Sequence, residues 1–379
     1  MGWNKPNSKL PQISSAICLA IYNEDNHKQK LRTIRRKIMA MSNQENSDKL
    51  IHAKANLERS KNRLEQIKAE IYSFNLTPGA NRAVIDEISN EEDSRPIQLS
   101  TEPVSHKSIL LEYPIKPTSR YGYGKPPNYA LYKIIEKNRV VYKKTLESFL
   151  IFSHYFLNIP LISNDSMEPE WNNNYIPGLD AIALYSFLAL KKPKKYFEVG
   201  SGNSSKFAKK AIKDFHLQTQ ITSFDPNPRA EIDSICDRVI RKPLEESDLS
   251  IFEELQSGDI LFIDGSHYCF MNSDVTVVFL EILPRLKPGV LVQLHDILLP
   301  YDYPPEWTNR FYSEQYLLAA YLLAEGDKLN IVLPNAFISY ERELSGILDE
   351  IWNNPNIEGV KSRKGSSFWF EIKLPGIPK

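Results

Sequence analysis

The hydrophobic residues of the C-terminal half form short apolar runs that alternate with amphipathic segments of helical period. The apolar runs have the length of buried strands and occupy residues 196–199, 220–225, 237–240, 259–264, 289–296, 329–334 and 367–374. Most are separated by segments with helical spacing, at residues 204–215, 275–286, 313–325 and 341–353. Such alternation is typical of a parallel sheet covered on both faces by helices. It predicts an α/β fold with a doubly wound, mostly parallel seven-stranded sheet and an antiparallel edge strand.

The N-terminal third has a different pattern, which predicts an α-helical extension over residues 1–75. Residues 25–74 are rich in charged and amide side chains and contain no Pro or Gly. Apolar residues recur there every seven positions, as in the seam of a coiled coil, at Leu50, Leu57, Leu64 and Ile71. Three interpretations stay open: a helical hairpin packed on the same chain, a coiled coil that joins copies into a homo-oligomer, and a solvated arm.

Between the extension and the sheet, the composition changes again. Scattered Pro, Gly, Ser and Thr in residues 76–128 predict an irregular linker or an extended wrap. Regular patterning resumes near Tyr129, with helical segments over residues 129–157 and 179–191. We therefore divide the chain into a helical extension (1–75), a linker (76–128) and an α/β domain (129–379) with its core at 190–379.

Charge and cysteine content exclude several classes of protein. The 379 residues include 47 Lys and Arg and 47 Asp and Glu, so no overall field attracts nucleic acid or anionic lipid. The three Cys residues have no paired spacing, which favours a reducing compartment over a disulfide framework. The apolar stretch at residues 149–162 is too short and too interrupted to span a bilayer. We expect a soluble, cytoplasmic protein that binds neither nucleic acid nor membranes.

The segment EVGSGNS, residues 198–204, joins the first predicted strand to a helix. Ligands of open parallel sheets bind at the carboxyl ends of the strands. Gly200 and Gly202 lack a Cβ and so permit a tight turn and a close ligand approach. Asp225 ends the second strand, and its carboxylate can accept hydrogen bonds from both hydroxyls of a ribose. The pattern predicts a cofactor that contains a nucleoside.

The residues around these glycines favour a cationic cofactor over a dinucleotide. A dinucleotide site usually has a third glycine, and Lys206 stands near that position here. Glu198 precedes the first glycine, where a carboxylate would repel a pyrophosphate and suit an aminoacyl sulfonium. Three alternatives stay open: a nucleotide-dependent oxidoreductase, a non-catalytic binding or scaffold protein, and glycines that serve only the turn.

These motifs resemble a known family. E-x-G-x-G with a later acid resembles the first two motifs of class I S-adenosylmethionine-dependent methyltransferases. FIDGSHYCFMNSDV (262–275), LPRLKPGVLVQLHDILLPYDYP (283–304) and RFYSEQYLLAAYLL (310–323) resemble later landmarks of the type 24 methyltransferase family. The resemblance covers roughly residues 170–340. It implies a Rossmann-like domain with S-adenosylmethionine as methyl donor, held by Glu198, Gly200, Ser201, Gly202, Ser204, Asp225, Pro226 and Asp264, with Leu244 and Glu245 near the adenine.

A second group of polar side chains follows the fourth and fifth strands. Asp264 closes the fourth strand, and His295 and Asp296 close the fifth, so the three are expected to converge at the cleft. Such side chains are able to bind a divalent metal, with Mg²⁺ as first choice, which would clamp two substrate oxygens. The alternatives are that Asp264 only caps its loop and that His295 and Asp296 pair without a metal.

The acceptor and the general base are predicted from a further resemblance. The site is similar to those of catechol-type and macrolide-sugar O-methyltransferases, which implies a hydroxyl on a small molecule or sugar as acceptor. In the sugar enzymes a D-G-S-H segment supplies a histidine base, which corresponds to His267 here, with His295 as the rival base. The chain departs from them at His295, where they have a carboxylate. The aromatic loop with Tyr301, Tyr303 and Trp307 is expected either to cover the substrate or to pack as a connection.

Overall fold

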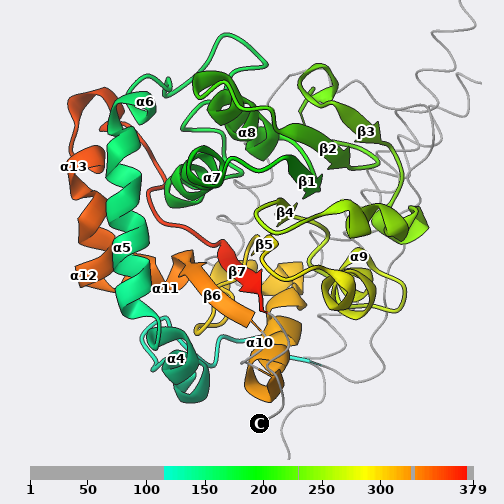
Figure 1. Cartoon of the computed structure of the whole chain (residues 1–379). Coiled ribbons are helices and arrows are strands. Elements are labelled where there is room, and N and C mark those ends of the chain that lie inside the picture. The colour runs from blue at the N-terminus through cyan, green and yellow to red at the C-terminus, as the bar shows by residue number, and fades with distance from the viewer. Residues whose placement is uncertain (1–114, 229, 326–328, 374–379) are drawn as a thin grey trace, which may run out of the picture. The chain divides into compact units, whose positions relative to one another are not determined.

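The structure is a computed structural model that describes residues 115–228, 230–325 and 329–373 (Figure 1). The chain divides into two compact units, residues 1–108 and 109–379. The first unit lies outside the described residues. The helical extension and the first part of the linker therefore stay predictions, and every described element belongs to the second unit.

A seven-stranded sheet in the order β3-β2-β1-β4-β5-β7-β6 forms the centre of this unit. Its strands are β1 (Lys195–Val199), β2 (Gln220–Phe224), β3 (Arg238–Ile240), β4 (Ile260–Ile263), β5 (Leu291–Leu294), β6 (Leu329–Pro334) and β7 (Phe368–Ile372). The pairs among β1 to β5 are parallel, and β7 runs antiparallel to both β5 and β6. The predicted Rossmann-like, mostly parallel sheet is confirmed, and the antiparallel strand lies one place in from the edge.

Helices cover both faces of the sheet, as the alternation of strands and helices predicts. Figure 1 shows α7 and α8 on one side of the sheet and α9 and α10 on the other. The helices are α4 (Tyr129–Glu136), α5 (Arg139–Phe149), α6 (Ser153–Phe156), α7 (Gly178–Lys191), α8 (Asn203–Asp214), α9 (Asp274–Val277), α10 (Glu314–Glu325), α11 (Asn335–Tyr340), α12 (Arg342–Ser345) and α13 (Asp349–Trp352).

One predicted helix, over residues 275–286, is not a regular α-helix. After α9 the chain continues as a π-helical turn, Val278–Ile282, and a 3₁₀ turn, Leu283–Arg285. Pro284 has no N–H to donate to a carbonyl one turn before it, so the i→i−4 ladder cannot continue through it.

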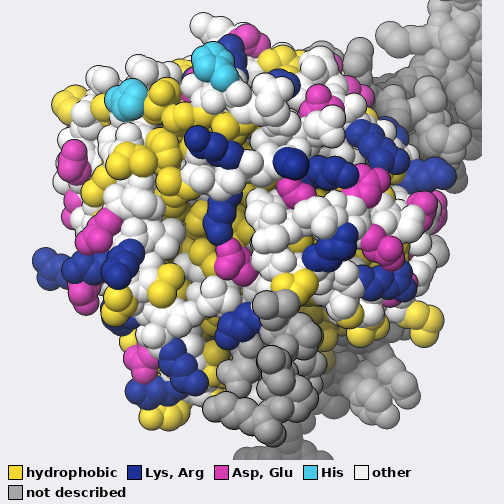
Figure 2. Space-filling model, viewed as in Figure 1, with side chains coloured by type: hydrophobic (Ala, Val, Ile, Leu, Met, Phe, Trp, Pro, Cys, Tyr) yellow, Lys and Arg dark blue, Asp and Glu magenta, His cyan; other side chains and the backbone are white. Residues whose placement is uncertain are grey.

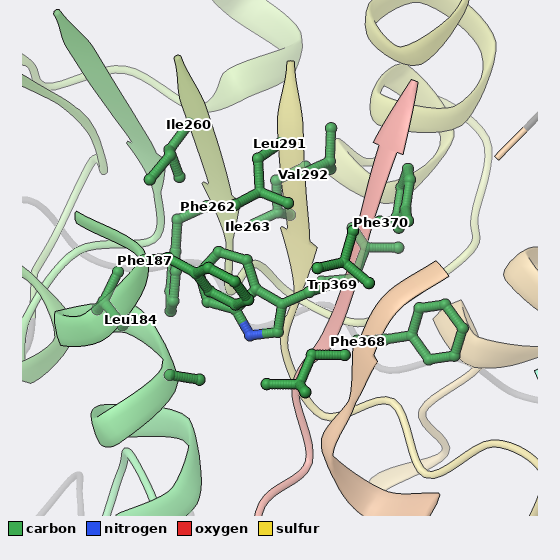
Figure 3. Packing of buried hydrophobic residues seen from close by; sticks show 14 of the residues in the cluster. Leu184, Phe187, Ile260, Phe262, Ile263, Leu291, Val292, Phe368, Trp369 and Phe370 are labelled. Carbon is green, nitrogen blue, oxygen red and sulfur yellow. The ribbon is translucent and has the colours of Figure 1, made fainter. Parts of the chain in front are cut away.

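Aromatic side chains hold α7 against the sheet. Figure 3 shows Phe187 of α7 against Trp369 of β7, with Phe262 of β4 next to them. The ring centroids of Phe187 and Trp369 are 4.7 Å apart, and Trp369 is fully buried. This packing fixes the position of α7, whose first turn contacts His295, directly after β5.

The described part of the predicted linker lies against the loop after β5. The backbone N–H groups of Arg120 and Tyr121 donate to Asp302 Oδ2 over 2.5 and 3.0 Å. The N–H of Asn128 donates to the carbonyl of Pro300, and the Asn128 side chain caps α4. Residues 120–128 are therefore tied to the α/β domain.

Surface charge of both signs is mixed on the face shown in Figure 2, with Lys and Arg next to Asp and Glu. This mixing agrees with the balanced composition of the chain. Among the described residues, no helix has the length and apolar character needed to cross a membrane.

Candidate functional site

A cavity of about 560 Å³ opens at the carboxyl ends of β1, β2, β4 and β5. This is the edge at which doubly wound sheets bind their ligands. The segments that line it are the loop after β1 (Val199–Ser204), the end of β2 (Phe224–Asn227), the turn after β3 (Pro243–Glu245), Phe262 with the loop after β4 (Asp264–Ser266, Tyr268, Phe270 and Asn272–Asp274), His295 after β5, and Tyr175 and Ile176 before α7.

Gly200 is required by the neighbouring strand. It has φ +76°, a left-handed conformation that favours glycine. A Cβ at this position would lie 1.8 Å from the backbone oxygen of Asp264. The close approach that the sequence predicts at Gly200 is therefore made by the protein's own backbone at the end of β4.

Gly202 is different, because the space around it is open. A Cβ built on Gly202 meets no atom within 4 Å, and the residue lines the cavity. Its N–H donates to Ser205 Oγ over 3.1 Å, where α8 begins. Gly202 thus leaves room for a ligand, whereas Gly200 leaves room for Asp264.

Glu198 does not line the cavity, which corrects the expectation that it faces a cationic ligand. Its carboxylate is fully buried, accepts a hydrogen bond from the Ser205 hydroxyl and accepts another from Tyr196 Oη over 3.1 Å. Burial raises the pKa of Glu198 to about 7. Glu198 therefore supports the glycine loop from the core side, through its hydrogen bond with Ser205, and is not among the residues that line the cavity.

Asp225 joins the glycine loop to the end of β2. Its Oδ2 accepts the N–H of Ser201 over 2.9 Å, and its Oδ1 accepts the N–H of Asn227 over 2.7 Å. Each carboxylate oxygen accepts a second hydrogen bond readily, so both remain able to accept from a ribose. Asp225 lines the cavity together with Pro226 and with Ser201 and Ser204 of the loop.

At the other end of the cavity, two imidazoles meet at one carboxylate. Asp264 Oδ1 lies 3.2 Å from Nε2 of His267 and 3.5 Å from Nδ1 of His295. The Asp264 side chain is 30% exposed and lines the cavity, as does the largely buried His295. Asp264 and His295 are thus brought together, as the sequence predicts.

His267 lies behind Asp264 and is not among the residues that line the cavity. Its Nδ1 is 2.8 Å from Oε2 of Glu314, the buried first residue of α10, and its Nε2 is 3.7 Å from Asp296 Oδ2. Its backbone has φ +62° and that of Asp296 has φ +53°, conformations that non-glycine residues seldom adopt. Both ring nitrogens of His267 therefore face carboxylates, and neither faces the cavity.

His295 is enclosed by three carboxylates. Its Nδ1 is 3.4 Å from Asp296 Oδ1 as well as 3.5 Å from Asp264, and its Nε2 is 3.4 Å from Oδ2 of Asp180 in α7. Neither ring nitrogen makes a hydrogen bond of good geometry. His295 therefore combines burial, an unsatisfied ring and a place at the cavity.

The pKa values of this cluster follow from its mixture of charges. Burial alone would lower the pKa of each histidine, but the nearby carboxylates raise the pKa of both His267 and His295 well above the usual value. Burial alone would raise the pKa of Asp264, but the two imidazoles hold it well below its usual range. The arrangement favours two imidazolium cations among carboxylate anions.

The metal centre predicted at Asp264, His295 and Asp296 is not supported. Within the described residues, no group of three or more His, Cys, Asp or Glu side chains is arranged to hold a metal ion. The reason lies in the pairing: the His295 ring faces the same carboxylates that would have to share a metal with it. An imidazolium nitrogen has no lone pair to give to a metal.

Several residues that build the site were not predicted. The sequence assigns no role to Asp180, Asn203 and Ser205, and Glu314 appears only within the segment 310–323. Of these, Asp180 carried a signal: it is a single acid in the apolar helix LDAIALYSFLAL. The aromatic loop is a packed connection, because Tyr303 packs against Trp307, Tyr312 and Tyr316 and does not line the cavity.

Comparison with protein-family models gives a match within the α/β domain. Residues 197–297 match the model of the type 24 family, which is described as a methyltransferase domain. The matched segment runs from within β1 to Ile297, three residues after β5, and contains most of the cavity lining. A search of curated proteins finds no relative that matches the chain.

Proposed function

Because residues 197–297 form a class I methyltransferase domain of this family, we propose that the protein uses S-adenosylmethionine to methylate a hydroxyl group on an uncharged small molecule or sugar. The family supports the general activity and implies the methyl donor. The acceptor, the methylated atom and the residues in each role are our own inferences from the site.

The observation that carries the proposal is the charge of the cavity lining. The described residues that line it include four carboxylates and no Lys or Arg. The carboxylates are those of Asp225, Glu245, Asp264 and Asp274. A pyrophosphate or phosphorylated sugar would meet repulsion there, because the cationic ring in the described lining, His295, already faces three carboxylates. A sulfonium cofactor and an uncharged acceptor suit this lining, whereas a nicotinamide dinucleotide does not.

The glycine end fits the nucleoside part of the methyl donor. Gly202 offers open space beside the start of α8, and Asp225 is able to accept both ribose hydroxyls. Leu244 and Glu245 line the cavity where the adenine would lie. We propose Gly200, Ser201, Gly202, Ser204, Asp225, Pro226 and Asp264 as cofactor-binding residues, with Glu198 supporting the loop.

The histidine end fits an acceptor hydroxyl. We propose that the hydroxyl lies between Asp264 and His295. Because the carboxylates raise the pKa of His295, the reactive form is the minority in which this ring is neutral, and the hydroxyl gives its proton to Nδ1 of that form. The oxygen then forms a bond to the methyl carbon while the carbon–sulfur bond breaks, and its electron pair stays on sulfur. His267 does not reach the cavity, so we assign it, with Glu314, to positioning Asp264. Most of the acceleration would come from holding the oxygen in line with the methyl group.

Calorimetry with S-adenosylhomocysteine tests the cofactor assignment. We expect the wild-type protein to bind it. The affinity of Asp225→Asn should be lower by at least about tenfold, since an amide accepts fewer hydrogen bonds than a carboxylate. Asp248→Asn is the matched control, because Asp248 caps an exposed turn, lies outside the cavity lining, and Asn caps equally well. Binding of NADH and not of S-adenosylhomocysteine would favour an oxidoreductase, and binding without turnover would favour a scaffold protein.

A paired screen of acceptors tests the charge argument. Catechol is compared with 3,4-dihydroxybenzoate, and methyl glucoside with glucuronate, by formation of S-adenosylhomocysteine. We expect the uncharged member of a pair to react at least about tenfold faster, because the carboxylate of the charged member is repelled by Asp264 and finds no Lys or Arg among the described lining residues. A faster reaction of the acids would overturn this acceptor class. Methylation of amines and not of hydroxyls would overturn O-methylation.

Location and assembly are also proposals. We propose a cytoplasmic location, and assembly into a homo-oligomer through the N-terminal helices. Size-exclusion chromatography tests the proposed assembly. The full chain should elute as an oligomer, whereas a chain that starts at residue 109 should elute as a monomer.

A further inference from the structure

Asp180 is a carboxylate inside an otherwise apolar helix. It lies in the first turn of α7, is fully buried, and has Leu179, Ala181 and Ile182 of the hydrophobic core as chain neighbours. Moving an isolated carboxylate out of water costs several kcal/mol unless partners compensate. Its presence there calls for a physical reason.

Neutral donors satisfy part of this charge. Asp180 Oδ1 accepts from Asn335 Nδ2 over 2.7 Å and from the N–H of Ser367 over 3.0 Å. Oδ2 accepts the N–H of Ser366 over 2.8 Å and its hydroxyl over 3.3 Å. These bonds join α7 to α11 and to the start of β7. They would serve a purely structural role, which an asparagine would largely preserve.

The partner of Asp180 that is able to carry a charge is His295. Nε2 of the ring is 3.4 Å from Asp180 Oδ2, and no described Lys or Arg forms an ion pair with Asp180. The opposite ring nitrogen, Nδ1, faces Asp264 and Asp296 at 3.5 and 3.4 Å. The imidazole is therefore held between a carboxylate in the core and the carboxylates near the cavity.

The second imidazole of the site has the same arrangement. Buried Glu314 contacts Nδ1 of His267 at 2.8 Å, while Nε2 of His267 faces Asp264 at 3.2 Å. Two outer carboxylates, Asp180 and Glu314, thus orient two imidazoles toward one inner carboxylate. The two arms come from helices far apart in the sequence, α7 and α10.

We propose that Asp180 is a positioning residue of the methyl-transfer site: its charge attracts the Nε2–H of His295 from 3.4 Å, fixes the ring, and turns Nδ1 toward Asp264 and the acceptor. This inference rests on the proposed function, because it assigns a task to His295 in that reaction. It adds a residue from outside the matched segment, since Asp180 precedes residue 197.

Histidine side-chain NMR on the full chain tests the proposal without an acceptor. The ring ¹⁵N signals of ¹⁵N-histidine protein are assigned with His295→Gln and His267→Gln. We expect Asp180→Asn to move the Nε2 signal of His295 and to leave His267 unchanged. Glu314→Gln is the matched comparison and should move His267 while leaving His295 unchanged. An unmoved His295 Nε2 in Asp180→Asn, or equal changes at both rings, would overturn the proposal.

Two further measurements separate positioning from a structural role. Asn335→Ala removes one neutral donor from Asp180, so it should lower the melting temperature without moving the His295 signals. With an acceptor in hand, Asp180→Asn should lower kcat by about 10- to 100-fold, the usual effect of a supporting residue, and leave the KM for S-adenosylmethionine within about twofold. An unchanged kcat would count against positioning.

Failure of a variant and failure of the premise give different results. If Asp180→Asn does not fold, the wild-type spectrum decides alone: a His295 Nε2 without a bound hydrogen overturns the proposal. If S-adenosylhomocysteine does not bind the wild-type protein, the proposed function fails, whereas the histidine spectra still report whether Asp180 holds the ring.

Discussion

The two ends of the cavity are built in different ways. At the glycine end, a continuous stretch from Val199 to Ser204 supplies most of the surface, and backbone groups make most of the contacts. At the histidine end, side chains from α7 and α10 contact the two imidazoles, which lie in the loops after β4 and β5 and both face Asp264. One end is local in sequence, and the other is assembled from segments more than 100 residues apart.

This difference predicts how each end responds to substitution. A backbone-built loop fails through steric conflict, which affects the whole fold. A side-chain cluster fails through loss of one charge or one ring nitrogen, which affects chemistry while the fold survives. Substitutions at the two ends should therefore separate stability from turnover.

The largest effect is expected at the histidine end. His295→Gln removes the imidazole that lines the cavity, so turnover of any acceptor found in the paired screen should fall by about 100- to 10,000-fold, the usual range for loss of a general base. Binding of S-adenosylhomocysteine should stay within about threefold. His154→Gln, at an exposed position of α6, is the control. Equal loss in both variants, or full activity in His295→Gln, would show that His295 has no such role.

The next effect separates the two glycines of the loop. Gly200→Ala places a methyl group 1.8 Å from the backbone of Asp264 in a left-handed conformation, so the free energy of unfolding should fall by roughly 3 kcal/mol or more. Gly202→Ala meets no atom and should keep its stability within about 1 kcal/mol, yet weaken S-adenosylhomocysteine binding. Urea unfolding and calorimetry check this pair. A stable Gly200→Ala, or tight binding by Gly202→Ala, would contradict the two assignments.

A smaller effect should report on the carboxylate under the glycine loop. Since burial raises the pKa of Glu198 to about 7, the folded state holds this proton more tightly than the unfolded state. The contribution to stability is complete below about pH 4.5 and is lost as the pH rises through about 7, by about 3 kcal/mol at most. Glu198→Gln should flatten that part of the pH dependence.

Urea unfolding at pH 5 and pH 7.5 measures this slope. The control is Glu350→Gln, an exposed carboxylate of α13, which should keep the wild-type difference between the two pH values. A Glu198→Gln protein that loses as much stability with rising pH as the wild type would show that Glu198 is not the cause.

The smallest effect is expected from metal removal. The carboxylates of Asp264 and Asp296 already face imidazoles, so EDTA should change neither the melting temperature by more than about 2 °C nor turnover by more than about twofold. Full loss of activity with EDTA, restored by Mg²⁺, would revive the metal prediction at Asp264, His295 and Asp296.

The sequence predicted the fold and the outline of the cavity for a clear physical reason. Buried strands need apolar runs, and α8 begins directly after the glycine loop, so both leave local patterns. The carboxyl ends of parallel strands must lie at one edge, which correctly placed Asp225, Asp264 and His295 around one space. The direction in which a side chain points was harder to predict. Glu198 is close to the glycines in the sequence, but its side chain points into the core.

By itself, the sequence determined the mostly parallel character of the sheet, the glycine loop and the set of polar residues at the strand ends. Only the tertiary structure decided which side chains pair. Asp180 and Glu314 reach the cluster because α7 and α10 pack near the edge where β5 ends, and because antiparallel β7 begins at that edge, next to Leu294. Short-range patterns cannot encode these contacts, since each depends on where distant elements lie once the core has packed.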